Sequence, residues 1–266
     1  MDIVVCTRFS YFGRSGWQSD FSQDKALLFA PERLTARLAT FQSITLPSLV
    51  AQTRQAFHHF VLTSDALPDW AMERLQAALR GAYGDESRYT ISAKPVAGAK
   101  KYLSEFLVRR FGTDIAAQVV LDDDDGLAAV FMEDLAPRLD AIAAAEAEGR
   151  LSLPYFVSYP YGYALDMRGD GTAELYRHSY DFINLGLTMV ARPQDRNIFA
   201  VDHLSAPRRY GVELVERKQM FVRSMHGFND SRVDVTHRWV REEDWHRQAD
   251  ILAALPCLRP LAAAQD

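Results

Sequence analysis

Four consecutive aspartates, Asp122 to Asp125, follow a short apolar run in the segment VVLDDDDGL at residues 119–127. Carboxylates this close repel one another and raise one another's pKa unless a cation neutralises the group. A lysine, solvent water and a metal ion are the candidate neutralising partners. In proteins Mg²⁺ is commonly held by one or two carboxylates together with substrate phosphates. The run therefore predicts a Mg²⁺ or Mn²⁺ site that also binds a phosphorylated substrate.

Two other interpretations of the run are a structural acidic turn and a calcium-binding loop. The dipole of a helix favours negative charge at its N-terminus, so a solvated acidic turn in front of a helix is the first alternative. An EF-hand is excluded by position. With Gly126 at the sixth place of the loop, Leu121 and Met132 occupy the first and twelfth places, where oxygen ligands are required.

Composition excludes several classes of partner. The 266-residue chain is long enough to bury a substantial core, and its net charge of −5 gives no overall basic field. Nucleic acid and anionic membranes are therefore not expected partners.

Cys6 and Cys257 lie at opposite ends of the chain and form no disulfide framework, which favours a reducing compartment. No apolar run reaches the ~18 residues of a membrane span. We expect a cytoplasmic protein without a transmembrane segment.

The elements that must position the aspartates alternate along the first half of the chain. Apolar and β-branched segments predict buried strands at residues 2–7, 58–65, 88–93 and 116–121. Helical spacing between these strands predicts an α/β fold with a mainly parallel sheet covered by helices. In such a sheet ligands bind beyond the carboxyl ends of the strands, which is where the aspartates lie.

The helices have recognisable start and stop signals. Pro31 suits the first position of a helix over residues 31–44, and Pro47 is expected to force either a break or a new helix start. Glycines are expected to close the next two helices, over residues 68–81 and 100–112. After the aspartates a further helix is predicted from its apolar stripe, formed by Leu127, Phe131, Leu135, Leu139 and Ile142.

From residue 151 the pattern changes to short aromatic segments separated by turns, which predict strands of mixed direction. A C-terminal helix is expected over residues 241–258. No internal repeat and no low-complexity linker interrupts the chain. We therefore expect a single domain over residues 1–266.

Three motifs in order carry a family resemblance: CTRFS at residues 6–10, TLPSLVAQTRQAF at 45–57 and LDDDDGL at 121–127. Together they resemble the bacterial family described as putative rhamnosyltransferases, which are DXD-containing glycosyltransferases of the GT-A fold. The resemblance covers roughly residues 1–135. It implies a GT-A-like three-layer α/β/α sandwich. Residues 1–126 would bind a nucleotide-sugar, and residues 127–266 would bind the acceptor.

The same resemblance implies roles for the acidic run. Asp122 would approach the ribose or a metal-bound water, and Asp123 falls on the variable position of the donor-binding motif. Asp124 would ligate Mn²⁺ or Mg²⁺ with Asp125 beside it, and His226 would supply a third ligand, because imidazole with carboxylates suits Mn²⁺. Four identical residues leave the register of the motif open by one position.

Further residues are expected to contact the donor, a dTDP- or UDP-sugar. Thr7 and Arg8 end the first strand, where the resemblance places the base and phosphates, and Arg offers a fork for phosphate oxygens. Asp65 would accept a hydrogen bond from the base. Lys100, at the start of the helix before the aspartates, would meet the diphosphate.

The acceptor, a saccharide or glycolipid, needs a general base for an inverting transfer. Asp202 is the expected base, and Asp181 is the second choice. Two other functions stay open. A metal-dependent phosphohydrolase of the haloacid-dehalogenase type carries its Asp-x-Asp after the first strand, whereas this run follows a later one. A non-catalytic module that binds nucleotide-sugars would share the same fold.

Overall fold

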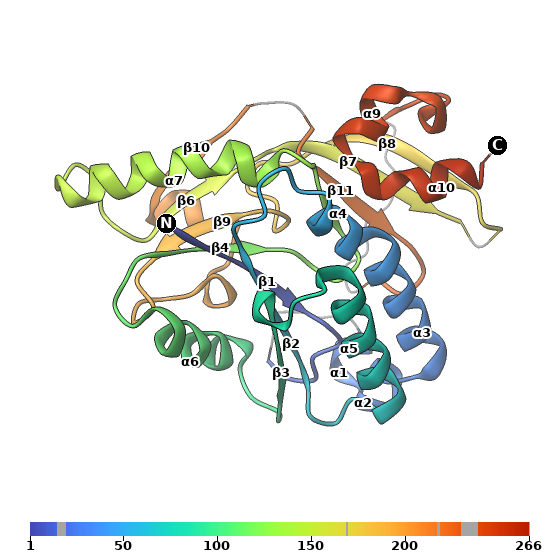
Figure 1. Cartoon of the computed structure of the whole chain (residues 1–266), viewed down its shortest axis with the longest axis horizontal. Coiled ribbons are helices and arrows are strands. Elements are labelled where there is room, and N and C mark those ends of the chain that lie inside the picture. The colour runs from blue at the N-terminus through green and yellow to red at the C-terminus, as the bar shows by residue number, and fades with distance from the viewer. Residues whose placement is uncertain (15–19, 169, 217–218, 230–238, 266) are drawn as a thin grey trace.

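The computed structural model describes residues 1–14, 20–168, 170–216, 219–229 and 239–265 of the chain. In this part of the chain the strands form two sheets (Figure 1). The larger sheet contains, side by side, β10 (Gly211–Leu214), β6 (Tyr155–Ser158), β9 (Thr188–Ala191), β4 (Ala116–Val120), β1 (Asp2–Arg8), β2 (His58–Ser64) and β3 (Tyr89–Lys94). The smaller contains β12 (Val240–Arg241), β8 (Ala173–Ser179), β7 (Tyr161–Met167), β11 (Phe221–Met225) and β5 (Gly126–Leu127).

The larger sheet is mainly parallel, as predicted. Strands β1, β2, β3 and β4 run in one direction, and β10 runs parallel to β6. Strand β9 runs antiparallel to both of its neighbours, β4 and β6. Three strands from the second half of the chain thus extend the sheet that the first half begins. Strands from both sides of residue 126 therefore lie in the same sheet.

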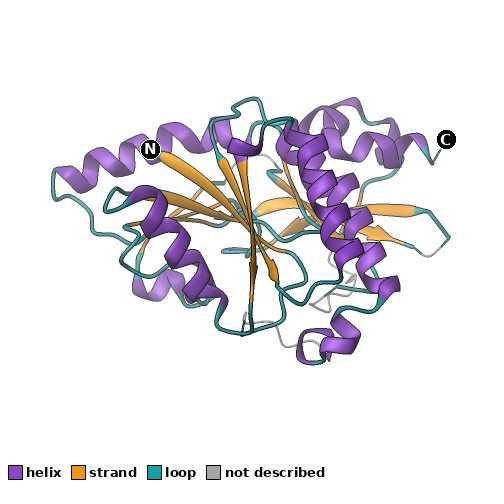
Figure 2. Cartoon of the chain, turned by 60° about the horizontal axis from the view of Figure 1, so that its bottom comes forward, coloured by secondary structure: helices purple, strands orange, loops and turns teal. Residues whose placement is uncertain are grey.

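Helices cover both faces of this sheet (Figure 2). Apolar side chains of α3 (Pro31–Thr40), α5 (Asp69–Tyr83) and α7 (Phe131–Ala147) pack in one core cluster, and those of α6 (Ala99–Phe111) pack in a second. This arrangement confirms the expected three-layer α/β/α sandwich. The other helices are short: α1 (Asp20–Gln23), α2 (Lys25–Leu28), α4 (Leu46–Val50), α8 (Ala206–Arg209), α9 (Ala249–Ala254) and α10 (Arg259–Ala263).

Of the two outcomes expected at Pro47, the structure shows the new start, because α4 begins at Leu46 with Pro47 in its first turn. Helix α3 continues through a π-helical turn, Phe41–Thr45, directly into α4. In this turn the Leu46 N–H donates to the carbonyl of Phe41, one residue further back than in an α-helix. A proline inside an α-helix clashes with the carbonyl four residues before it. The wider π-turn just before Pro47 relieves that clash, so the chain stays helical.

Two element ends were also predicted wrongly. Helix α5 passes through Gly81 and ends at Gly84, which takes a left-handed φ of 65°. The extra turn buries Tyr83 against the core. After the aspartates, Leu127 belongs to the short strand β5, and the helix begins only at Phe131. The end of α6 at Gly112 is as expected.

The second half contains strands of mixed direction, as predicted. Strand β7 pairs antiparallel with β8 and parallel with β11, and β11 pairs antiparallel with β5. The expected C-terminal helix over 241–258 is instead divided into α9 and short 3₁₀ turns, and α10 follows it.

The larger core cluster contains residues from both halves, from Ile3 to Ala262. This continuity agrees with a single domain, which remains a prediction. None of the helices within the described residues has the length and apolarity needed to cross a membrane.

Candidate active site

The four aspartates lie where strand β4 ends, at the carboxyl edge of the parallel strands. The neighbouring strand β1 ends in Arg8 at the same edge, because the two strands are parallel. The smaller sheet reaches the same place. The Asp125 carboxylate accepts a hydrogen bond from the N–H of Ser224 in β11, with an N–O distance of 3.0 Å. Side chains from both halves of the chain therefore meet at the aspartates.

A close backbone approach fixes this meeting point. A Cβ atom on Gly126 would lie 3.1 Å from a methyl of Val222 in β11 and 3.2 Å from the Cβ of Ser48 in α4. Glycine allows the chain after the aspartates to pass between helix α4 and strand β11. A larger residue at position 126 would need Val222 or Ser48 to shift.

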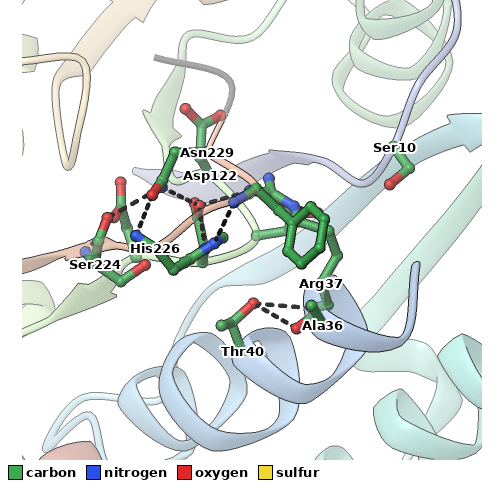
Figure 3. A network of polar contacts seen from close by, with 12 residues as sticks. Ser10, Ala36, Arg37, Thr40, Asp122, Ser224, His226 and Asn229 are labelled. Carbon is green, nitrogen blue, oxygen red and sulfur yellow. Dashed lines mark hydrogen bonds and ion pairs between the residues drawn. The ribbon is translucent and has the colours of Figure 1, made fainter. Parts of the chain in front are cut away.

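An arginine, and not a lysine, neutralises the centre of the run. Arg37 of α3 lies against Asp123 and Asp124. Figure 3 shows Arg37 in this network with Asp122, His226 and Asn229. Its Nη1 donates to Asp124 Oδ2 at 2.6 Å, and its Nε and Nη2 donate to the two oxygens of Asp123. Arg37 and Asp123 are both buried, so this is an ion pair shielded from solvent.

A histidine and an amide from the loop after β11 complete the contacts of Asp124. Its Oδ2 lies 3.2 Å from Nε2 of His226 and 2.8 Å from Nδ2 of Asn229, which donates to it. The backbone N–H of Phe228 donates to Nδ1 of His226 at 3.2 Å. Because Nδ1 accepts, Nε2 carries the proton and donates to the carboxylate. The structure thus brings together Asp124 and His226, which lie 102 residues apart.

The electrostatic environment separates the aspartates from one another. Burial alone would raise the pKa of Asp124, but Arg37 and His226 outweigh it and lower that pKa to about 2. Burial and the neighbouring charge of Asp124 raise the pKa of Asp125 well above its ordinary value. Burial also raises the pKa of Asp122, although Arg8 opposes this change. The run therefore combines a strongly acidic carboxylate with two that resist ionisation.

The residues at this edge offer oxygen ligands that suit the implied metal ion. Within the described residues, no group of three or more His, Cys, Asp or Glu side chains is arranged to hold a metal ion. A divalent cation held by one or two carboxylates and by substrate phosphates needs no such group, and Asp124 and the partly exposed Asp122 offer the oxygens. For Nε2 of His226 to bind a metal, its proton would have to move to Nδ1, which here accepts from the N–H of Phe228.

Arg8 lies at this edge but is already engaged. Its Nη2 donates to Oδ1 of Asp122 at 3.1 Å, and its guanidinium lies 5.1 Å from the centre of the Phe199 ring. Phe199 belongs to the segment that also carries Asp202 and His203. Burial lowers the pKa of His203, while the charges of Asp202 and Asp122 oppose that change. This segment therefore borders the acidic run.

Asp202, the expected base, is exposed and accepts a hydrogen bond from the N–H of Leu204 at 3.1 Å. Asp181, the second choice, is also exposed, in the turn after β8. The choice of base remains a prediction.

The remaining expected donor contacts are distributed unevenly. Thr7 is fully buried and its Oγ1 is hydrogen-bonded to Nε2 of His59 at 2.9 Å, a placement that does not support a contact with the base. Asp123 is equally buried against Arg37, which does not support a contact with the donor. Asp65 and Lys100 are exposed at the end of β2 and the start of α6. Their roles stay predictions.

Sequence reasoning missed Arg37, Asn229 and Phe199. A signal for Arg37 exists in the sequence. Arg33 and Arg37 are one helical turn apart, beside the buried apolar positions Leu34 and Leu38. Charged residues on the buried side of a helix need partners, so this spacing indicates buried ion pairs or hydrogen bonds. No comparable pattern marks Asn229 or Phe199.

Comparisons with known proteins give a family and distant structural neighbours. Residues 2–238 match the family described as "Putative rhamnosyl transferase". No curated protein matches the chain. The chain is similar to TarS residues 1–349 of S. aureus in complex with UDP, with 11% identity and a TM-score of 0.47. That match covers 85% of this chain but 61% of TarS 1–349, so the chain spans about three fifths of its length.

A second similar structure is HddC from Yersinia pseudotuberculosis, with 13% identity, a TM-score of 0.36, and coverage of 83% of this chain and 92% of that one. The family match, in contrast, extends over most of the chain, from β1 to residue 238. It confirms the resemblance carried by the three sequence motifs. The chain belongs to the family described as "Putative rhamnosyl transferase".

Proposed function

We propose that the protein is a metal-dependent, inverting glycosyltransferase. It moves a sugar, rhamnose if the family description holds, from a nucleoside diphosphate to a saccharide or glycolipid acceptor in surface polysaccharide or glycoconjugate synthesis. The observation that supports this most is the contact between Asp124, in the run that follows β4 of the larger sheet, and His226, in the loop that follows β11 of the smaller sheet. Ligands of open α/β sheets bind at this carboxyl edge.

The donor diphosphate would lie beside Asp122 and Asp124, the residues proposed to hold Mn²⁺ or Mg²⁺, with Asp125 and His226 next to them. A bound divalent cation supplies a Lewis acid that neutralises the diphosphate leaving group. Asp122 is held by Arg8, which keeps its carboxylate in place at the end of β1. Lys100 and Asp65 are the proposed contacts to the outer phosphate and the base, which is either uracil or thymine.

Asp202 would act on the acceptor. Its carboxylate takes the proton of an acceptor hydroxyl while the hydroxyl oxygen attacks the anomeric carbon of the donor sugar. The bond from that carbon to the diphosphate oxygen breaks, and its electron pair leaves with the nucleoside diphosphate. One displacement of this kind inverts the anomeric centre. The exposure of Asp202 beside the segment that contacts Arg8 supports this role.

The proposed location is the cytoplasm. Both cysteines, Cys6 and Cys257, are free and buried. Free thiols of this kind are the usual state in a reducing compartment.

A nucleotide panel tests the proposal. UDP, dTDP, GDP and ADP, and the corresponding sugars, are titrated by calorimetry with Mn²⁺ and with EDTA. A glycosyltransferase is expected to bind UDP or dTDP only with the metal and to release that nucleotide from its sugar in the presence of acceptor. Release of inorganic phosphate from the nucleotide would instead indicate a phosphohydrolase. Metal-dependent binding without turnover of any sugar nucleotide would indicate a binding module.

A further inference from the structure

Within the acidic run, Asp122, Asp123 and Asp124 have different surroundings. The side chain of Asp123 is 0% exposed and that of Asp122 is 23% exposed. Both carboxylate oxygens of Asp123 accept hydrogen bonds from Arg37. Only Oδ2 of Asp124 accepts from Arg37, and the same oxygen also contacts His226 and Asn229. The sequence DDDD contains no information that distinguishes these residues. The difference comes from helix α3.

Arg37 is held in place by its helix. Leu34 and Leu38, its neighbours on α3, are fully buried in the larger core cluster. The Arg37 side chain is itself only 2% exposed. A planar guanidinium bound to two carboxylates has fixed donor directions, so it defines the orientation of both of its partners. The position of α3 and the planar guanidinium of Arg37 together determine that Asp123 is the aspartate that points away from the edge.

We propose that Arg37 is the positioning residue that sets the register of the acidic run. It takes Asp123 as a buried counter-ion and orients Asp124, which leaves Asp122 and Asp124 as the two carboxylates of the Asp-x-Asp pair. This inference rests on the proposed function of the site. Asp123 then has no contact with the nucleotide-sugar, contrary to expectation, and its role is to hold the acidic run in place.

The ion pairs of the run agree with this assignment. Arg37 pairs with Asp123 and Asp124, and Arg8 pairs with Asp122. Arg37 thus stabilises the buried aspartates before any ligand binds.

The test compares Arg37→Gln and Arg37→Lys with the wild-type protein. Mn²⁺ affinity is measured by electron paramagnetic resonance without nucleotide, and UDP or dTDP affinity is measured by calorimetry at saturating Mn²⁺. Arg37→Gln is expected to weaken Mn²⁺ binding by about 10–100-fold, as the loss of a residue that orients a ligand commonly does. Arg37→Lys keeps the charge without the fork, so an intermediate loss is expected.

Arg33→Gln is the matched control. Arg33 lies one turn earlier on α3, is 1% exposed, and donates to the hydroxyl of Ser10 and to the carbonyl of Leu28. Its substitution is expected to lower the melting temperature while leaving Mn²⁺ affinity within about twofold of the wild-type value. Equal weakening of Mn²⁺ binding in Arg33→Gln and Arg37→Gln would overturn the proposal, since a general loss of packing would then explain both.

A second variant covers the case in which Arg37→Gln does not fold, because removing one partner of a buried pair leaves an unpaired charge. Arg37→Gln combined with Asp123→Asn removes both charges. We expect this double variant to fold and still to bind Mn²⁺ about 10–100-fold more weakly, because Asp124 remains unoriented. Wild-type Mn²⁺ affinity in the double variant would overturn the proposal. If the wild-type protein binds Mn²⁺ but neither nucleotide, the proposed function fails, whereas the role of Arg37 is still decided by the Mn²⁺ measurement.

Discussion

Two buried polar clusters lie next to strand β1, and they differ in charge. The acidic cluster joins Asp123 and Asp124 to Arg37 through ion pairs. The neutral cluster is centred on His59 of β2, which is hydrogen-bonded to Thr7 and Tyr83 at 2.9 Å each. Burial, with a smaller contribution from His58, lowers the pKa of His59 to about 3, so the ring is uncharged at neutral pH.

The comparison shows how a buried polar cluster indicates a binding site. Each ring nitrogen of His59 has a partner inside the protein, and both partners come from the first half of the chain. The acidic cluster lies at an edge that both halves share, and Asp124 is contacted there by Arg37 from the first half and by His226 from the second. Substitutions in the acidic cluster are expected to change function, and those in the neutral cluster are expected to change stability.

The largest expected effect lies beside the acidic cluster and separates chemistry from binding. Asp202→Asn keeps the volume and a polar tip but removes the proposed base. Turnover is expected to fall by ~10²–10⁴-fold, while Mn²⁺ and donor bind normally. Transfer rates and calorimetric donor titrations on the same preparation check this. Near-normal transfer would show that the base is elsewhere, with Asp181 tested next, and lost donor binding would assign Asp202 to the binding shell.

The second effect concerns Asp124, the centre of the acidic cluster. Asp124→Asn is expected to weaken metal-dependent binding of the nucleoside diphosphate by about 100-fold or more, because losing a proposed ligand costs at least as much as losing a residue that only orients a ligand. The fold is expected to remain, since Arg37 retains Asp123 as its counter-ion. Asp140→Asn, at an exposed position of α7, is the control. Unchanged Mn²⁺-dependent affinity in a calorimetric titration would contradict the assignment of Asp124.

The third effect distinguishes a functional histidine from a structural one. His226→Ala removes the donor to Asp124 Oδ2 and the proposed metal ligand. Metal affinity is expected to fall by about one to two orders of magnitude. Donor titrations at limiting Mn²⁺ check this, with His246→Ala as the control in the C-terminal segment. Donor affinity independent of His226 at limiting Mn²⁺ would make the residue structural.

The smallest expected effect belongs to the neutral cluster and appears in stability. Below pH 6.5 the unfolded chain protonates His59, whereas the folded protein keeps it neutral down to about pH 3. The unfolded state therefore binds more protons, and stability falls as the pH decreases through this range. His59 alone is expected to lower the free energy of unfolding by about 2 kcal/mol between pH 8 and pH 5.

Urea unfolding at these two pH values measures this contribution. His59→Gln keeps a donor and an acceptor but cannot titrate, so its loss of stability between pH 8 and pH 5 is expected to be smaller. His58, whose pKa burial lowers to about 4, continues to contribute in the variant. Equal pH dependence in both proteins would show that the ring of His59 is not held neutral.

The sequence was sufficient for the elements whose pattern is local. The strands β1, β2 and β4 are rich in apolar residues and buried along nearly their whole length, because helices cover both faces of their sheet. The start of α3 at Pro31 and the end of α6 at Gly112 follow from backbone restrictions of single residues. The position of the acidic run at the carboxyl edge follows from the same alternation of strands and helices.

Non-local features were not predictable in this way. The sequence predicts that α5 ends at Gly81, but the helix ends at Gly84 because the longer helix buries Tyr83 in the core. A glycine stop signal carries no information about that burial. The strands β5 and β12 have two residues each, too few for any alternation. The pairing of Arg37 with Asp123 joins positions 86 residues apart in sequence.

The insertion of β9 between β4 and β6 also affects how the chain folds during synthesis. Strand β4 emerges from the ribosome long before β9, which follows α7, β6, β7 and β8. Until β9 arrives, one edge of the nascent parallel sheet has unpaired backbone groups beside the acidic residues. Contacts this distant in sequence slow folding and prolong the exposure of such an edge. The repulsion among the carboxylates at that edge opposes edge-to-edge aggregation while the sheet is incomplete, so the charges that later bind a ligand also protect the nascent chain.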